Sequence, residues 1–305
     1  MARFEVSTIV GCRVACTYCP QKLHVSAYKS RKAGTNVLTM EMFENCIDKL
    51  PPNSEIYFSG FSEPFLNPDC SRFLRFAHQR GFIVSVFTTA IGIEHHTIDQ
   101  IRDIPFKSFV VHLPDNRDTM KMEVNDGYFA ILDRLREAIP NIHFLLTKGQ
   151  RLSDSFHPRI KDYLKRNKIR CFIHVKHSRA GAIGANDAAI LPRLKGDLAY
   201  CPRLDINVLL PNGDVVLCCQ DFGQKHVLGN LKESTFDALH QSDEFRHVLD
   251  GLTDSTQDIL CRECVLYGRR RGIRGLYDIS KVAGLFVKVW VLNAIHNGLA
   301  AIRKK

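Results

Sequence analysis

The sequence has no apolar run long enough to cross a membrane. Its most apolar stretch, 282–292, falls short of the roughly 20 residues that a transmembrane helix needs. The first ten residues alternate apolar and polar types, so they do not resemble a secretory signal. No internal repeat or low-complexity segment is present, and the chain does not resemble a disordered or collagen-like protein. With 45% hydrophobic and 24% charged residues, we expect a globular protein with a sizeable core.

Cysteine is abundant despite the lack of an export signal. Eleven cysteines in such a chain argue against a disulfide framework and for metal ligation in the reducing cytosol, which predicts a cytoplasmic protein. Three of them, Cys46, Cys70 and Cys171, occur singly in apolar patterns and are predicted to be small core side chains. The other eight are clustered, at positions 12, 16 and 19, at 201, 218 and 219, and at 261 and 264.

The net charge of +10 favours an acidic partner, such as a phosphate, a nucleotide, an anionic lipid, or an acidic protein or substrate. The basic cluster at 269–274 has no interleaved aromatic residues. A nucleic-acid binding stripe normally combines basic and aromatic side chains, so we expect no nucleic-acid partner.

Strand-like and helix-like segments alternate over the first 176 residues, which predicts an α/β fold. Repeated βα units give parallel strands joined by right-handed crossovers. Six such units predict a partial (β/α)6 TIM-like barrel, with its chemistry at the carboxyl ends of the strands. The predicted strands are 4–10, 55–59, 82–87, 108–112, 142–147 and 171–176, and the predicted helices are 40–50, 69–80, 93–102, 126–138 and 158–166.

The pattern changes after residue 176. Residues 178–184 are mostly small and indicate a loop, and residues 191–200 are predicted to be a linker. Pro211-Asn212-Gly213 then separates two strand-like runs, 205–210 and 214–218, and predicts a β-hairpin, which is followed by a helix at 234–249. We therefore predict three parts: a core domain at 1–190, a small hairpin and helix domain at 191–268, and a basic amphipathic C-terminal helix at 269–305.

Three cysteines, Cys12, Cys16 and Cys19, follow the first predicted strand with the spacing C-x3-C-x2-C, and no fourth lies nearby. Four thiolates would close a tetrahedral zinc site or a 4Fe–4S cluster. Three would hold such a cluster and leave one iron open to a substrate. A structural zinc site, or three unpaired core thiols, is the alternative.

This motif resembles the signature of the radical S-adenosylmethionine (SAM) superfamily, with Tyr18 as the aromatic residue before the last cysteine. The resemblance implies that the open iron binds the amino and carboxylate groups of SAM. It also implies that an electron from the cluster cleaves SAM to a 5′-deoxyadenosyl radical, which abstracts a hydrogen atom from the substrate.

Further segments match the family in register. Residues 59–64, Ser-Gly-Phe-Ser-Glu-Pro, resemble its GGEP element, although Phe61 stands where the second glycine is expected. Thr88-Thr89 occupies the place of a turn that faces SAM, and 178–181 resembles a loop of relatives with a C-terminal cluster domain. His112 or Asp115 would bind the hydroxyl groups of the SAM ribose. The cofactor-binding residues implied in this way are Tyr18, Ser59, Gly60, Glu63, Thr88, His112 and Arg179.

The second cysteine set, with Gly213 between its first two members, resembles the SPASM and twitch extensions found behind radical SAM domains. Too few cysteines remain for two auxiliary clusters, so the resemblance implies one auxiliary 4Fe–4S cluster. A zinc site is the alternative, since thiolate cages also suit zinc. Cys219 could replace Cys218, because adjacent strand residues point to opposite faces. The implied ligands are Cys201, Cys218, Cys261 and Cys264.

Basic triplets at 269–271 and 303–305 flank the apolar run in the C-terminal segment, which contains Trp290. These features suit a helix that packs on the barrel or on a second copy of the chain. A peripheral contact with a membrane surface is the alternative.

The sequence thus predicts a radical SAM oxidoreductase that acts on a small polar molecule, sugar-like or nucleotide-linked. A flavodoxin- or ferredoxin-type electron donor would serve it. One alternative within the family is a maturase that modifies a peptide or protein. A second alternative, from another class, is a non-catalytic iron–sulfur or zinc protein, which would not cleave SAM.

Overall fold

The computed structural model describes residues 2–31, 34–148, 155–175, 178–183, 198–201, 203–264 and 268–269. Most of the predicted linker, 191–197, and all but the first residue of the predicted C-terminal helix lie outside these ranges. Among the described residues, no helix combines the length and the apolar character that a membrane crossing requires.

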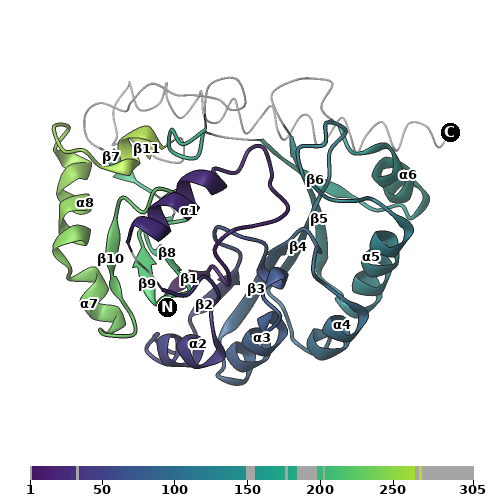
Figure 1. Cartoon of the computed structure of the whole chain (residues 1–305), viewed down its shortest axis with the longest axis horizontal. Coiled ribbons are helices and arrows are strands. Elements are labelled where there is room, and N and C mark those ends of the chain that lie inside the picture. Colours follow the sequence, from purple (N-terminus) through teal and green to yellow (C-terminus); the bar gives the residue numbers. More distant parts are fainter. Residues whose placement is uncertain are drawn as a thin grey trace.

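A nine-stranded sheet, mostly parallel, forms the centre of the protein, with the order β10-β9-β8-β1-β2-β3-β4-β5-β6. It curves into an open barrel, which confirms the predicted α/β class and the partial barrel (Figure 1). Its strands are β1 (Arg3–Val6), β2 (Glu55–Phe58), β3 (Ile83–Thr88), β4 (Ser108–Leu113), β5 (Ile142–Lys148), β6 (Cys171–Val175), β8 (Ile206–Leu209), β9 (Asp214–Val216) and β10 (Val227–Asn230). A separate pair consists of β7 (Leu198–Tyr200) and β11 (Gly268–Arg269).

Apart from α1 (Gln21–Ser30), the helices cover the outer face of the curved sheet (Figure 1). Several begin at a residue whose side chain caps the helix: Thr39 accepts from the Met42 N–H at 3.2 Å, and Asn125 accepts from the Tyr128 N–H at 2.9 Å. The helices are α1 (Gln21–Ser30), α2 (Met40–Ile47), α3 (Cys70–Gln79), α4 (His95–Ile101), α5 (Asp126–Ala138), α6 (Pro158–Arg166), α7 (Phe236–His240) and α8 (Asp243–Thr253), with short 3-10 turns η1 (Pro64–Leu66) and η2 (Leu260–Glu263).

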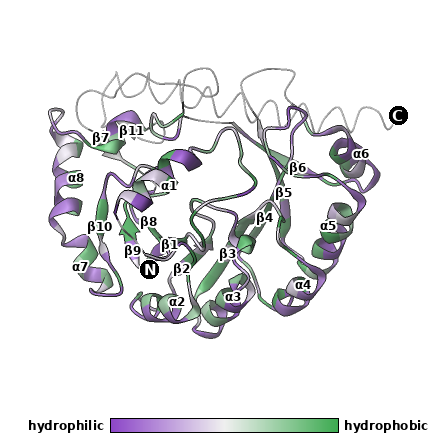
Figure 2. Ribbon diagram, in the orientation of Figure 1, coloured by the Kyte–Doolittle hydropathy of each residue, from purple (hydrophilic) through white to green (hydrophobic). Residues whose placement is uncertain are grey.

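The main core lies between the sheet and the outer helices, where apolar strand residues meet the apolar faces of the helices (Figure 2). In β1, Phe4 and Val6 belong to this core, whereas Glu5 between them points to the inner side of the barrel. The single cysteines Cys46, Cys70 and Cys171 are buried, with at most 4% exposure, which confirms that they are core side chains.

The hairpin after residue 200 continues the barrel sheet. Its first strand, β8, pairs in parallel with β1, with Glu5 opposite Val208. The helix predicted at 234–249 is two helices, because Ser242 ends the first stretch and caps α8 by accepting from the Phe245 N–H at 3.1 Å. Helix α1, directly after the third cysteine of the loop, was not predicted; its mean hydropathy is low and its buried side chains are His24 and Tyr28.

Candidate functional site

The three-cysteine loop follows β1 at the carboxyl edge of the sheet, where the βα repeat predicted an active site. Gly11 turns the chain there with φ +93°, which a residue with a side chain rarely adopts. Val14 and Tyr18 anchor the loop in a small apolar cluster with Met120 and Ile183. The Thr17 N–H also donates to the Thr119 carbonyl at 2.8 Å, so the loop after β4 supports it.

The three thiols of this loop lie close to one another in a water-poor environment. Burial, and then the neighbouring Cys19, raise the pKa of the Cys16 thiol to about 12. Burial also raises the pKa of Cys12, although the backbone N–H groups of Glu63, Val14 and Ala15 oppose it. Thiolates held together in such a place need a cationic centre, and the positive irons of a cluster would supply one. The residues present therefore fit an iron–sulfur cluster.

No three His, Cys, Asp or Glu side chains converge on a point for a single metal ion within the part of the chain that the structure describes. An iron–sulfur cluster does not require this convergence, because each thiolate binds a different iron.

Glu63, between β2 and η1, carries a buried carboxylate with 4% exposure. One oxygen accepts from the Thr88 hydroxyl at the end of β3, and the other accepts from the Thr89 N–H at 2.5 Å and the Thr89 hydroxyl at 2.7 Å. Burial raises the pKa of this carboxyl, and these donors act against the rise. The residues that follow β2 and β3 therefore fix the Glu63 carboxylate, a hydrogen-bond acceptor, next to the cysteine loop.

Phe61, where the family has a second glycine, packs away from this acceptor. Its ring is 1% exposed and lies 4.5 Å from the His24 ring and 4.7 Å from the Phe222 ring, centroid to centroid. Gly60 has φ +69°, and a Cβ added there would stand 3.1 Å from the Ser7 Cβ. The first glycine of the element is therefore required by the backbone, whereas the second position has a packing role in this chain.

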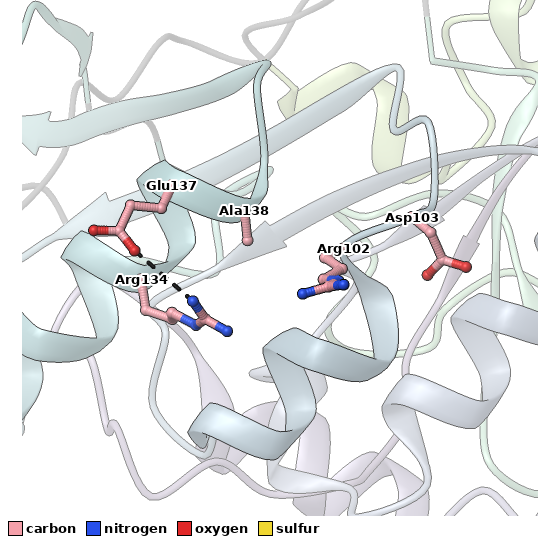
Figure 3. Close-up of a pocket in the computed structure, with 5 residues that line it drawn as sticks. All are labelled: Arg102, Asp103, Arg134, Glu137 and Ala138. Atoms are coloured by element: carbon pink, nitrogen blue, oxygen red, sulfur yellow. Dashed lines mark ion pairs between the residues drawn. The ribbon is translucent and has the colours of Figure 1, made fainter.

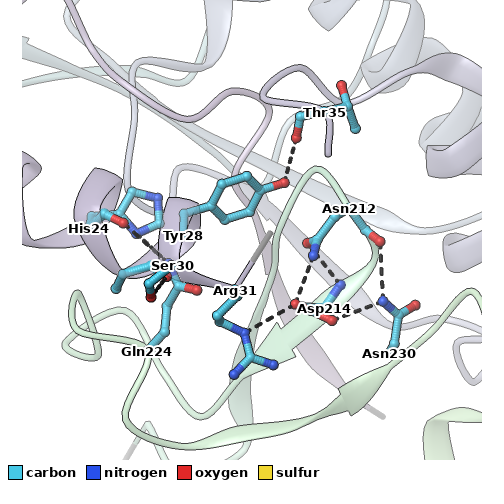
Figure 4. Close-up of polar contacts among 10 residues, drawn as sticks. His24, Tyr28, Ser30, Arg31, Thr35, Asn212, Asp214, Gln224 and Asn230 are labelled. Carbon is cyan, nitrogen blue, oxygen red and sulfur yellow. Dashed lines mark hydrogen bonds and ion pairs between the residues drawn. The ribbon is translucent and has the colours of Figure 1, made fainter. Parts of the chain in front are cut away.

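Helix α1 is fixed to the hairpin region by polar contacts (Figure 4). Gln224 donates to the His24 carbonyl at 3.3 Å, and the Arg31 guanidinium lies 3.5 Å from the Asp214 carboxylate. Asn230 donates to the same carboxylate at 2.9 Å. These contacts connect the helix after the cysteine loop to the segment that carries the second cysteine set.

Further side chains gather on the inner face of the barrel. Burial and the nearby His174 and Arg179 lower the pKa of His112 to about 3, and burial followed by Arg179 lowers the pKa of His174 to about 4. The Arg179 guanidinium stacks over Phe222 at 5.8 Å. Asp115, the alternative to His112 in the sequence analysis, accepts three hydrogen bonds within its own loop, from Arg117 and Thr119. Of these two residues, only His112 belongs to the inner group.

Four cysteines of the second set come together from three segments. After burial, the neighbouring Cys201 and Cys264 are the next causes that raise the pKa of Cys261. Burial, then the adjacent Cys219 and, more weakly, Asp221 and Cys264 raise the pKa of Cys218. Cys218 and Cys261 belong to the main core, and Cys201 packs against it. Four desolvated thiols near one another suit a closed iron–sulfur cluster, in which each thiolate binds a different iron and no ligand position stays open.

Cys219, in the turn after β9, belongs to a different apolar cluster from Cys218. Its thiol accepts from the Arg203 guanidinium at 3.4 Å, and the same guanidinium lies 3.5 Å from the Glu5 carboxylate. Burial, and next the Glu5 charge, raise the pKa of Cys219 to about 12. Glu5 and Arg203 were not singled out in the sequence. The signal available was an acidic residue at an inward position of an otherwise apolar strand.

The surface pocket in Figure 3 lies on the outside of the barrel, between α4 and α5. Its charged side chains come from Arg102, Asp103, Arg134 and Glu137, and Arg134 pairs with Glu137 at 3.8 Å. None of the cysteines lines it. The two cysteine sites therefore lie away from this pocket.

Solved structures with a similar fold include BtrN in complex with AdoMet and 2-DOIA, at 16% identity and a TM-score of 0.59, covering 87% of this chain and 92% of that chain. Another is anSMEcpe with AdoMet and a Cp18Cys peptide, at 10% identity and a TM-score of 0.60, covering 95% and 98%. A third is SuiB of Streptococcus suis bound to the precursor peptide SuiA, at 13% identity and a TM-score of 0.54, covering 83% and 64%. At these identities the likeness shows the fold. No curated protein sequence matches the chain significantly.

Two family models match the chain itself. The iron–sulfur cluster-binding SPASM domain matches residues 196–265, and the radical SAM superfamily matches residues 6–166, just over half of the chain. The first match contains the four gathered cysteines, and the second contains the three-cysteine loop and Glu63. The chain uses SAM and 4Fe–4S clusters, and it belongs to the radical SAM superfamily, with a SPASM-type extension.

Proposed function

We propose that this chain is an oxidoreductase that abstracts a hydrogen atom from a small polar substrate, sugar-like or nucleotide-linked. Cys12, Cys16 and Cys19 would hold the SAM-binding cluster. Cys201, Cys218, Cys261 and Cys264 would hold one auxiliary cluster. The observation that carries the proposal is the second site: four thiols gather apart from the open three-cysteine loop.

When bound, the first cluster would supply the electron that cleaves SAM, and the auxiliary cluster would offer an electron acceptor. The residues of the chain bind and orient SAM. Glu63 would accept a hydrogen bond from the SAM ammonium, while Thr88 fixes the Glu63 carboxylate. The Gly60 turn, at φ +69°, would bring a backbone carbonyl close to SAM. Tyr18, Ser59, His112 and Arg179 complete the proposed set.

A small polar substrate is supported by the charged inner face near the cysteine loop. Arg179 and Arg203 lie there with Glu5 as the acidic partner, beside the two histidines of low pKa. This mixture of donors and acceptors suits hydroxyl or phosphate groups. The fold neighbour BtrN, solved with 2-DOIA, is consistent with a small-molecule substrate.

A maturase that modifies a peptide is the second candidate. It is supported by the likeness to anSMEcpe and SuiB, both of which have been solved with bound peptides. In either case we propose a flavodoxin- or ferredoxin-type electron donor and a cytoplasmic location. We also propose that the basic C-terminal segment contacts a protein or a membrane surface.

The test is anaerobic reconstitution, counting of iron and sulfide, and reduction with dithionite in the presence of SAM. About eight irons per chain and formation of 5′-deoxyadenosine are expected. Extracts from cells grown in heavy water, separated by ultrafiltration, then distinguish the two substrate classes. Deuterium transferred to 5′-deoxyadenosine from the filtrate supports a small molecule, and transfer only from the retained fraction supports a peptide or protein. A fully loaded protein that never forms 5′-deoxyadenosine contradicts both.

Glu63→Gln is expected to weaken SAM binding by about 10- to 100-fold, because a hydrogen bond to a charged group is worth about 1.5–3 kcal/mol. The neutral amide also places an N–H group against donors that now face a carboxylate, from Thr88 and Thr89. Anaerobic equilibrium dialysis measures the change. Glu137→Gln, at an exposed carboxylate, is the control. An unchanged SAM affinity in Glu63→Gln would remove Glu63 from the proposed site.

A further inference from the structure

The proposed auxiliary ligands lie on segments that are far apart in the chain. Cys218 follows β9, whereas Cys261 and Cys264 belong to η2 and the residue after it. A cluster held by both segments requires them to keep a fixed separation, so the contacts between them determine how well the site is formed.

His226 connects these two segments directly. Its backbone carbonyl accepts from the Leu217 N–H at 3.0 Å, and its ring Nε2 accepts from the Leu260 N–H at 2.9 Å. Leu217 immediately precedes Cys218, and Leu260 immediately precedes Cys261. The imidazole is 1% exposed, so its hydrogen bonds do not compete with bulk water.

Two carboxylates hold His226 in this position. Because Nε2 accepts a hydrogen bond from Leu260, the ring proton is on Nδ1, which donates to Glu244 on α8 at 2.6 Å. Asp221, which is fully buried, accepts from the Lys225 N–H at 2.8 Å and the His226 N–H at 2.9 Å. The tautomer, the ring orientation and the backbone of His226 are thus all determined.

We propose that His226 is a positioning residue for the auxiliary cluster, which holds Leu260, and through it Cys261, at the distance from Cys218 that the cluster requires. This inference rests on the proposed four-cysteine ligand set. Its consequence is that the auxiliary cluster would depend on an imidazole that is not one of its proposed ligands. Asp221 and Glu244 contribute by fixing this imidazole.

The neighbouring residue supplies a matched control. Lys225 pairs with Asp258 at 2.8 Å and so also joins the two segments, but its side chain is 36% exposed and that of Asp258 is 73% exposed. An exposed ion pair contributes little to stability. The Asp221 contact uses the backbone N–H of Lys225, which remains in Lys225→Ala.

The experiment uses the chain of residues 1–305 with Cys12, Cys16 and Cys19 replaced by alanine, so that the auxiliary cluster is the remaining source of iron absorbance. Into this parent we introduce His226→Ala, His226→Gln or Lys225→Ala. The amide oxygen of glutamine can occupy the place of Nε2 and accept from Leu260, which alanine cannot do. Loss of visible absorbance in the presence of an iron chelator gives the lifetime of the cluster, and its EPR spectrum after reduction reports its geometry.

In His226→Ala the lifetime of the cluster is expected to be shorter than in the parent by about tenfold or more, which is typical of substitutions that remove a partner of a metal ligand. Its EPR spectrum should also be broadened. His226→Gln should recover most of the lifetime, and Lys225→Ala should match the parent. A His226→Gln variant as labile as His226→Ala, or equal lability of His226→Ala and Lys225→Ala, overturns the positioning role. A parent that holds no cluster removes the ligand assignment itself, which is visible before His226 is changed.

Discussion

Formation of 5′-deoxyadenosine is expected to be abolished by Cys16→Ala. The three-cysteine loop offers the smallest number of thiolates that can hold the SAM-binding cluster, and Cys16 is the middle one of the three. Burial keeps the pKa of its thiol near 12, so only a strongly cationic partner would hold it as a thiolate. Its removal should also reduce the iron content from about eight to about four per chain. Chromatographic assay of 5′-deoxyadenosine and iron counting measure the two effects.

Cys46→Ala is the matched control, because Cys46 is a fully buried thiol in the main core, on α2. Removing one buried sulfur there should cost stability but leave both clusters and SAM cleavage intact. Persistent 5′-deoxyadenosine formation in Cys16→Ala would show that the cluster is held elsewhere. Loss of activity in both variants would point to unfolding, which circular dichroism detects.

Adjacent cysteines are expected to respond in opposite ways to the same substitution. Cys218→Ala should lose the auxiliary cluster and with it about four irons, because Cys218 lies near Cys264 and is one of the four proposed ligands. Cys219→Ala should keep both clusters, because its thiol points to Arg203 and Glu5 on the other side. Iron counting and EPR of the reduced proteins distinguish the two results.

Each variant is the control for the other, because both remove a buried thiol at neighbouring positions. If Cys219→Ala loses the auxiliary iron and Cys218→Ala keeps it, the ligand assignment is reversed. If neither variant loses iron, the four-cysteine site holds no cluster.

The βα repeat was readable from the sequence because buried parallel strands and amphipathic helices have strong, local patterns. Helices α5 and α6 begin and end where predicted, at 126–138 and 158–166. The cysteine spacing and the position of Glu63 were equally local, since both follow directly after predicted strands. That Glu63 and Thr88 meet follows from parallel neighbours β2 and β3 ending at one edge.

Other features depend on contacts between distant segments. Helix α1 carries a weak apolar pattern, and it is held by Gln224 and Asp214 from nearly 200 residues away. The pairing of β8 with β1 is likewise invisible in either strand alone. The break between α7 and α8 has a local signal that the prediction of one helix missed: Ser242 caps α8, and the first turn of α8 is acidic.

The sequence by itself determined the chemistry of this chain: a three-thiolate loop at a strand end, a carboxylate after the next strand, and a further set of thiols. The tertiary structure decided which side chains act together. It places Cys218 near Cys264, whereas Cys219 lies near Glu5. It also brings His226 between the segment before Cys218 and the segment before Cys261. The physical reason is that ligand type and spacing are local properties, whereas the direction of a side chain and the partner it meets depend on how distant segments pack.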